Sequence, residues 1–112
     1  MAYDEGLAER LRDEFAERYD VIEKKMFGGL AFMVSGQMCC GIIKDTLMAR
    51  VGPDQYLKSL AKKHVSEMDF TGKAMKGLVY IAPEGIESDK ELKYWVELSL
   101  AFIKTLPPKK PK

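Results

Sequence analysis

The chain of 112 residues has little of what most catalytic and metal-binding sites are built from. It contains one histidine, His64, one tryptophan and two cysteines, Cys39 and Cys40. A single histidine excludes a multi-histidine zinc site and leaves little for a Ser-His-Asp arrangement. The glycines match no phosphate-binding fingerprint, and the scattered acidic residues suggest no acid–base pair. We therefore expect a non-enzymatic protein that holds neither a metal nor a cofactor.

An excess of charge of one sign is also lacking. The 18 basic residues face 17 acidic ones, so the formal net charge is +1. Domains that hold nucleic acid usually carry a clear basic excess, and direct nucleic-acid binding is therefore not expected. No apolar run approaches the roughly 18 residues of a membrane span, and the N-terminus has no apolar signal-peptide core. We predict a cytoplasmic protein without membrane contact.

The two cysteines are adjacent in a segment that is predicted to be a strand. Successive side chains of a strand point to opposite faces, so a disulfide between Cys39 and Cys40 is not expected. Two free thiols suit a reducing compartment. The simplest interpretation is a pair of small, buried and inert residues. The alternative is a cysteine nucleophile paired with His64, and only the distance between them can decide.

What the sequence does contain is a dense apolar stretch over residues 24–51, which is typical of antiparallel strands joined by tight turns. Period-two alternation predicts strands over 21–27, 30–34, 38–43, 47–51 and 77–82. Apolar periodicity of 3.6 predicts helices over 3–19, 53–63 and 88–106. Asp4 is expected to cap the first helix, and Ser88 and Glu91 form a capping box before the last. Residues 64–72 are predicted to form a loop.

These elements predict an α+β domain. Its antiparallel sheet of about four to five strands is flanked by N-terminal and C-terminal helices in the order α-β-β-β-α-β-α. We expect one domain over residues 1–106 and a disordered Lys/Pro tail over 107–112. The apolar residues Tyr94, Leu98 and Ala101 flank the buried face of the last helix, which is consistent with a homodimer. The predicted core of the central stretch is Leu30, Phe32, Val34, Ile42, Leu47 and Val51.

Cations lie near glycines at the ends of several predicted strands. Lys25, Arg50 and Lys76, together with Gly28, Gly29 and Gly77, are predicted to gather at one rim. A rim of this kind would hold an anion or the acidic side chain of a partner. The alternative interpretation is that these cations cover the sheet edge and prevent it from pairing with another chain.

Four segments together resemble a known family over nearly the whole chain. They are KMFGGLAFMVSGQMCCGII, LMARVG, MDFTGKAMKGLVYI and PEGIESDKELKYWVELSLAFIKTLPPK, and they resemble the TfoX/Sxy family N-terminal domain. The matching motif positions are Met26, Phe27, Gly28, Gly29, Arg50, Val51, Gly52, Asp69, Phe70, Gly72, Met75, Lys76 and Gly77. The resemblance implies an α+β domain with an antiparallel sheet and flanking helices.

The same resemblance implies a function. The namesakes of the family are bacterial regulators of natural competence that act with a cyclic-AMP-responsive transcription factor and carry a second, C-terminal domain. This chain is similar to the stand-alone, single-domain form, and the family supplies no catalytic residues. We therefore expect a regulatory or protein-interaction domain that is linked to transcription control and binds another protein. The alternative is a small-anion or ligand-binding protein, or an uncharacterised enzyme that uses Cys39 or Cys40 with His64.

Overall fold

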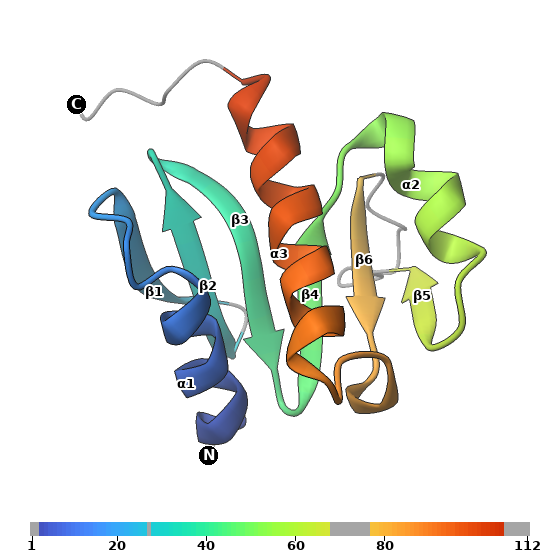
Figure 1. Cartoon of the computed structure of the whole chain (residues 1–112), viewed down its shortest axis with the longest axis horizontal. Helices are drawn as coiled ribbons and strands as arrows, with labels where there is room; N and C mark the ends of the chain where they lie inside the picture. The colour runs from blue at the N-terminus through green and yellow to red at the C-terminus, as the bar shows by residue number, and fades with distance from the viewer. Residues whose placement is uncertain (1–2, 27, 68–76, 107–112) are drawn as a thin grey trace.

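The structure, a computed structural model, describes residues 3–26, 28–67 and 77–106 (Figure 1). Within them, six strands form one antiparallel sheet in the order β1-β2-β3-β4-β6-β5. The strands are β1 (Val21–Met26), β2 (Gly29–Val34), β3 (Gln37–Ile43), β4 (Thr46–Arg50), β5 (Val65–Glu67) and β6 (Leu78–Ile81). The helices are α1 (Glu5–Glu14), α2 (Pro53–Leu60) and α3 (Asp89–Lys104), and the 3-10 helix η1 (Pro83–Gly85) precedes α3. The predicted α+β class with flanking helices is confirmed, with the order α-β-β-β-β-α-β-β-α.

The first four strands lie within one residue of their predicted bounds, because alternation and tight turns mark both ends of each. The predicted loop over 64–72 is wrong in part, since β5 pairs with β6 through Val65 and Ile81. Two of its three residues are exposed, so the segment shows no apolar alternation. Residues 68–76 and the predicted tail over 107–112 lie outside the described residues.

Helix α1 is shorter than the sequence pattern suggests. The Asp4 side chain accepts hydrogen bonds from the amides of Gly6 at 2.8 Å and Leu7 at 3.2 Å, which confirms the predicted cap. Before this cap, Tyr3 forms a β-bridge with Lys44, and the Asp4 amide donates to the Lys44 carbonyl at 2.6 Å. The chain therefore enters the helix from an extended segment that is held by the β3–β4 turn.

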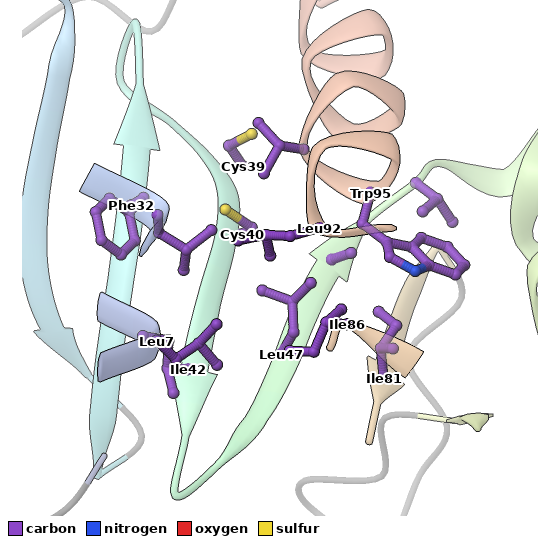
Figure 2. Packing of buried hydrophobic residues seen from close by; sticks show 14 of the residues in the cluster. Leu7, Phe32, Cys39, Cys40, Ile42, Leu47, Ile81, Ile86, Leu92 and Trp95 are labelled. Carbon is purple, nitrogen blue, oxygen red and sulfur yellow. The ribbon is translucent and has the colours of Figure 1, made fainter. Parts of the chain in front are cut away.

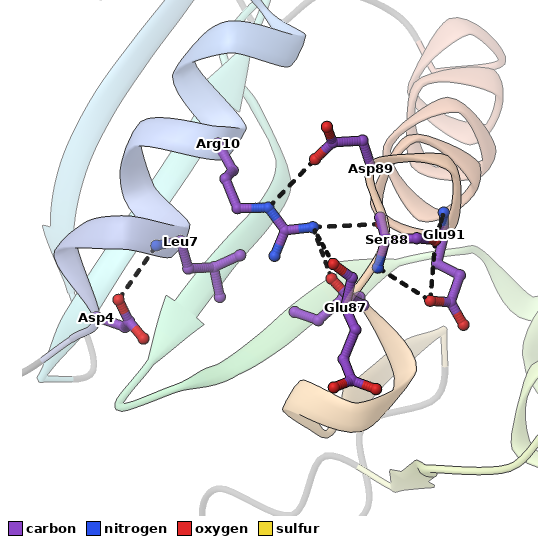
Figure 3. A network of polar contacts seen from close by, with 8 residues as sticks. Asp4, Leu7, Arg10, Glu87, Ser88, Asp89 and Glu91 are labelled. Atoms are coloured by element: carbon purple, nitrogen blue, oxygen red, sulfur yellow. Dashed lines mark hydrogen bonds and ion pairs between the residues drawn. The ribbon is translucent and has the colours of Figure 1, made fainter.

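An arginine of α1 binds the segment that starts α3 (Figure 3). Nη2 of Arg10 donates to the carbonyl oxygens of Ile86 at 2.7 Å, Ser88 at 3.2 Å and Glu87 at 3.4 Å. Its Nε lies 3.5 Å from the carboxylate of Asp89. The predicted capping box of α3 is present immediately after this contact. We call this set of contacts the Arg10 clamp, because it fixes the first turn of α3 against α1.

The core lies between one face of the sheet and the helices α1 and α3, which cover that face side by side (Figures 1 and 2). Every residue of the predicted central core is buried. Phe15 at the end of α1 stacks on Phe32 of β2 with ring centroids 5.5 Å apart. Burial of such large apolar side chains supplies most of the stabilising free energy of a domain of this size.

The two cysteines differ from the expectation for a regular strand. The β2–β3 register pairs Phe32 with Cys40 but Met33 with Met38, so Cys39 is the additional residue of a β-bulge. A bulge bends the strand and interrupts the alternation of side chains. Both cysteines belong to the same buried cluster instead of facing opposite sides (Figure 2). Both thiols are free.

Candidate interaction site

Two chain segments that are distant in sequence meet where β4 ends. Gly52 is the N-cap of α2, and Pro53 occupies the first helical turn, where its missing N–H is not needed. The carbonyl oxygen of Gly77 accepts hydrogen bonds from the amides of Val51 at 2.8 Å and Gly52 at 3.1 Å. These two bonds extend the β4–β6 pairing, in which Arg50 lies opposite Leu78.

The two glycines of this junction have positive φ angles, 86° for Gly52 and 91° for Gly77. A Cβ atom on Gly52 would lie 2.3 Å from Cδ1 of Phe102 in α3. A Cβ atom on Gly77 would lie 3.4 Å from Cα of Gly52. Both the backbone conformation and the close approach therefore require glycine at position 52.

The side chain of Arg50 lies beside this junction, next to Phe102 of α3. Its Cζ lies 5.4 Å from the ring centroid of Phe102, within the range of a cation–π contact. Nη1 makes two long contacts of 3.4 Å, to Oε1 of Gln37 and to the carbonyl of Met38. Arg10, Arg12 and Arg18 each form an ion pair, whereas no carboxylate among the described residues lies within ion-pair distance of Arg50.

The half-buried guanidinium of Arg50 borders a surface hollow of about 620 Å³. We call it the Arg50 hollow, and its lining residues are Met38, Arg50, Gly52, Pro53, Gly77, Leu78 and Phe102. The sequence reasoning identified Arg50 and Gly77 but not Met38, Leu78 or Phe102. The only sequence signal for the last of these was its place in the final turns of an amphipathic helix, which indicates core.

The predicted rim of cations and glycines is not assembled as one site. Lys25 and Gly29 lie beside Leu30 and Ile42 at the end of the sheet that carries the β3–β4 turn. Arg50 and Gly77 lie at the opposite end, and Lys76 is outside the described residues. A Cβ atom on Gly29 would lie 2.0 Å from the Ile42 carbonyl oxygen. The close packing of β2 against β3 therefore explains why this position is glycine. Gly28, with φ of 74°, belongs to the turn before β2.

The structure does not bring the cysteines and the histidine together. Cys40 lies on β3, whereas His64 precedes β5, and three inter-strand spacings of about 4.8 Å give a separation of roughly 14 Å. The hydrogen bond with the Cys39 side chain, and then burial, raise the pKa of the Cys40 thiol well above its ordinary value. Neither cysteine is more than 1% exposed. A nucleophilic Cys–His pair, which needs hydrogen-bond contact, is therefore not formed.

Among residues 3–26, 28–67 and 77–106, no three histidine, cysteine, aspartate or glutamate side chains group as they would around a metal ion. In the same ranges, every helix is too short or too polar to cross a membrane.

The chain is thus an α+β domain with one antiparallel sheet, and the Arg50 hollow lies on its surface where β4 ends. The family model for the TfoX N-terminal domain matches residues 13–103, and the chain belongs to this family. The matched range includes every residue that lines the Arg50 hollow. No curated protein and no solved structure shows significant similarity to the chain.

Proposed function

We propose that this chain is a non-enzymatic protein-interaction domain that binds an acidic segment of a partner protein in the Arg50 hollow. Membership of the TfoX N-terminal domain family supports a competence-regulator-like domain. The proposed role is regulatory and linked to transcription control, as the family's namesakes suggest.

The observation that carries the proposal is the chemistry of Arg50. The half-buried guanidinium stacks on a ring, and within the described part of the chain its polar contacts are the two long ones of Nη1 and none is with a carboxylate. It therefore has donors left for a charge-assisted bond to a partner carboxylate. Arginine, methionine and aromatic residues are enriched at the centres of protein interfaces, and this hollow combines all three types. A partner carboxylate that reached Arg50 would be flanked by Met38, Leu78 and Phe102, which would limit the access of water to the pair.

The experiment is affinity capture from a lysate of the source organism with the full chain immobilised, compared with Arg50→Ala and Lys25→Ala. Lys25 is a matched control, because it is an exposed cation at the opposite end of the sheet. We expect a specific partner on the wild type and on Lys25→Ala, and its loss on Arg50→Ala. Thermal unfolding of each variant checks that the fold is kept.

Two outcomes would overturn the proposal: the wild-type chain retains no specific protein, or Arg50→Ala retains the same partner to the same extent. Raising the salt concentration should weaken capture, because the proposed contact includes an ion pair at a partly exposed site. Capture that strengthens with salt would indicate an apolar interface that does not depend on Arg50.

A further inference from the structure

A second hollow, of about 540 Å³, lies at the opposite end of α3 from the Arg50 hollow. The α2–β5 connection, η1 and the first turns of α3 supply its lining. We call it the Tyr94 hollow, and its lining includes Lys62, Lys63, His64, Lys90, Tyr94 and Trp95. The volume is within the range of small-molecule sites. The hollow shares no residue with the Arg50 hollow.

The backbone of His64 is strained in a way that glycine would avoid. Its φ is 68°, and its carbonyl oxygen accepts a hydrogen bond from the Ala82 amide at 2.8 Å. The other non-glycine residues with positive φ in the described ranges, Ser35 and Lys44, belong to hairpin turns, where this conformation is common. A residue other than glycine at positive φ outside a hairpin turn is uncommon, and such a position points to a role for its side chain.

The neighbouring segment η1 leaves room for the imidazole of His64. A Cβ atom on Gly85 would lie 3.1 Å from Cβ of His64 and 2.7 Å from Cγ2 of Ile81. Glycine in η1 therefore allows the His64 side chain to lie against the backbone at the edge of the hollow. The Arg10 clamp binds the carbonyls of the segment that follows Gly85, and it therefore fixes the η1 side of the hollow.

The hollow carries a surplus of positive charge. Three lysines line it, against the carboxylates of Glu84 and Glu91. The Glu91 carboxylate already accepts hydrogen bonds from Ser88, from the amide at 3.1 Å and from Oγ at 3.0 Å. An anion in the hollow would therefore meet more cations than competing carboxylates.

An aromatic surface lies beside these cations. Tyr94 is 43% exposed, and its ring meets the ring of Trp95 edge to face with centroids 5.1 Å apart. Nζ of Lys62 lies 5.0 Å from the Tyr94 ring centroid. A flat ring placed against the exposed part of Tyr94 would carry an attached anionic group within reach of Lys62.

We propose that the Tyr94 hollow binds a small molecule that carries a phosphate or carboxylate group on a flat aromatic ring. His64 and Lys62 contact the anionic group, and Tyr94 contacts the ring. This site is separate from the proposed partner site, so the two proposals can fail independently.

Trp95 provides a direct readout, because it is the only tryptophan of the chain and it lines the hollow. The full chain is titrated with phenyl phosphate, benzoate, inorganic phosphate and phenol while tryptophan fluorescence is recorded. We expect saturable binding of phenyl phosphate or benzoate, at least about tenfold tighter than that of inorganic phosphate or phenol. The tighter of the two distinguishes a phosphate from a carboxylate ligand.

No saturable change with either aromatic anion up to about 10 mM would overturn the proposal. Inorganic phosphate that binds as tightly as phenyl phosphate would show that the ring is not recognised, which also overturns it.

Variants test the roles of the two residues that contact the anion. His64→Gly should raise the unfolding temperature, because it relieves the positive φ, and should weaken binding by about tenfold. Lys62→Gln should weaken binding similarly, whereas Lys25→Gln and Arg50→Ala should leave it unchanged. Unchanged binding by His64→Gly, or a lower unfolding temperature for it, would contradict the argument from backbone strain.

Discussion

Both hollows pair a cation with an aromatic ring of α3, yet they differ in the type of residue that adopts a positive φ angle. Arg50 lies over Phe102 at 5.4 Å, and Lys62 lies over Tyr94 at 5.0 Å. The two rings are eight residues apart in one helix, which corresponds to about 12 Å along its axis. One helix therefore presents similar chemistry at both ends of the sheet.

The difference lies in which residues adopt positive φ angles. At the Arg50 hollow these are Gly52 and Gly77, so the backbone is unstrained and the packing is tight. At the Tyr94 hollow it is His64, which bears the strain. Glycine adopts this conformation at little cost, whereas a histidine carries a conformational cost there.

The largest expected effect tests the tight packing at the Arg50 hollow. Gly52→Ala should destabilise the protein by about 3 kcal/mol, because it combines an unfavourable φ with a clash against the Phe102 ring. Gly28→Ala is the matched control, since Gly28 has a similar φ of 74° but no atom within 4 Å of the added Cβ. It should cost only about 1 kcal/mol. Urea unfolding of both variants measures the difference.

The double variant Gly52→Ala/Phe102→Leu extends this experiment. Removing the ring should recover part of the lost stability, so the two changes should not be additive. Equal losses for Gly52→Ala and Gly28→Ala would show that the close approach to α3 contributes nothing.

The next effect concerns the part of α3 between the two rings. Ser99 is completely buried, and within the described residues its Oγ has no hydrogen-bond partner. Ser99→Ala should stabilise the protein by about 1 kcal/mol, because it removes an unpaired hydroxyl and improves helix propensity. Thermal and urea unfolding give the measurement. Partner capture and ligand binding should not change, and a loss of stability would indicate that the hydroxyl has a partner.

The smallest effect contrasts Arg12, which forms ion pairs, with Arg50, which forms none within the described residues. The hydrogen bond from Arg12 lowers the pKa of Glu23 below its ordinary value. A carboxylate of this kind stabilises the fold above its ordinary pKa of 4.5, and this contribution is lost as the pH falls through the lower folded-state value. Glu23→Gln should therefore cost about 0.5 kcal/mol at pH 7, as is typical of exposed ion pairs.

Denaturant unfolding between pH 7 and pH 3 checks this prediction. The difference between Glu23→Gln and the wild type should shrink as the pH falls below about 4.5. Arg50→Gln breaks no ion pair within the described residues, so its effect on stability should not follow this pH dependence. A constant difference for Glu23→Gln would contradict the assigned ion pair.

Most of the fold could be predicted because its signals are local. Alternation and turn residues marked β1 to β4, and the capping box at Ser88 marked α3. Strand β5 could not be found in this way, because Val65–Glu67 is short and owes its conformation to its pairing with β6. The bulge at Cys39 depends on the register between two strands, which the sequence of one strand does not contain.

The candidate site was predicted less well, for a topological reason. Proximity of a cation to a glycine suggested one rim, but each hairpin of an antiparallel sheet reverses the chain. The turn before Gly29 therefore lies at the same end as the β3–β4 turn, and Arg50 lies at the other end. Counting the chain reversals between β1 and β4 would have placed Lys25 and Arg50 at opposite ends of the sheet. The meeting of Lys62 with Tyr94 depends on packing between elements and has no such signal.

The Arg10 clamp also bears on the order in which the molecule is assembled. It joins Arg10 to a carbonyl that is 76 residues away in the sequence. During synthesis α1 emerges before α2 and α3, and the Ile86 carbonyl that Arg10 binds follows it by 76 residues. The hairpins of the sheet involve much shorter separations and close at a smaller loss of entropy. The attachment of α1 to the start of α3 is therefore expected to be among the last contacts to form, after those of α1 with β1, β2 and the β3–β4 turn.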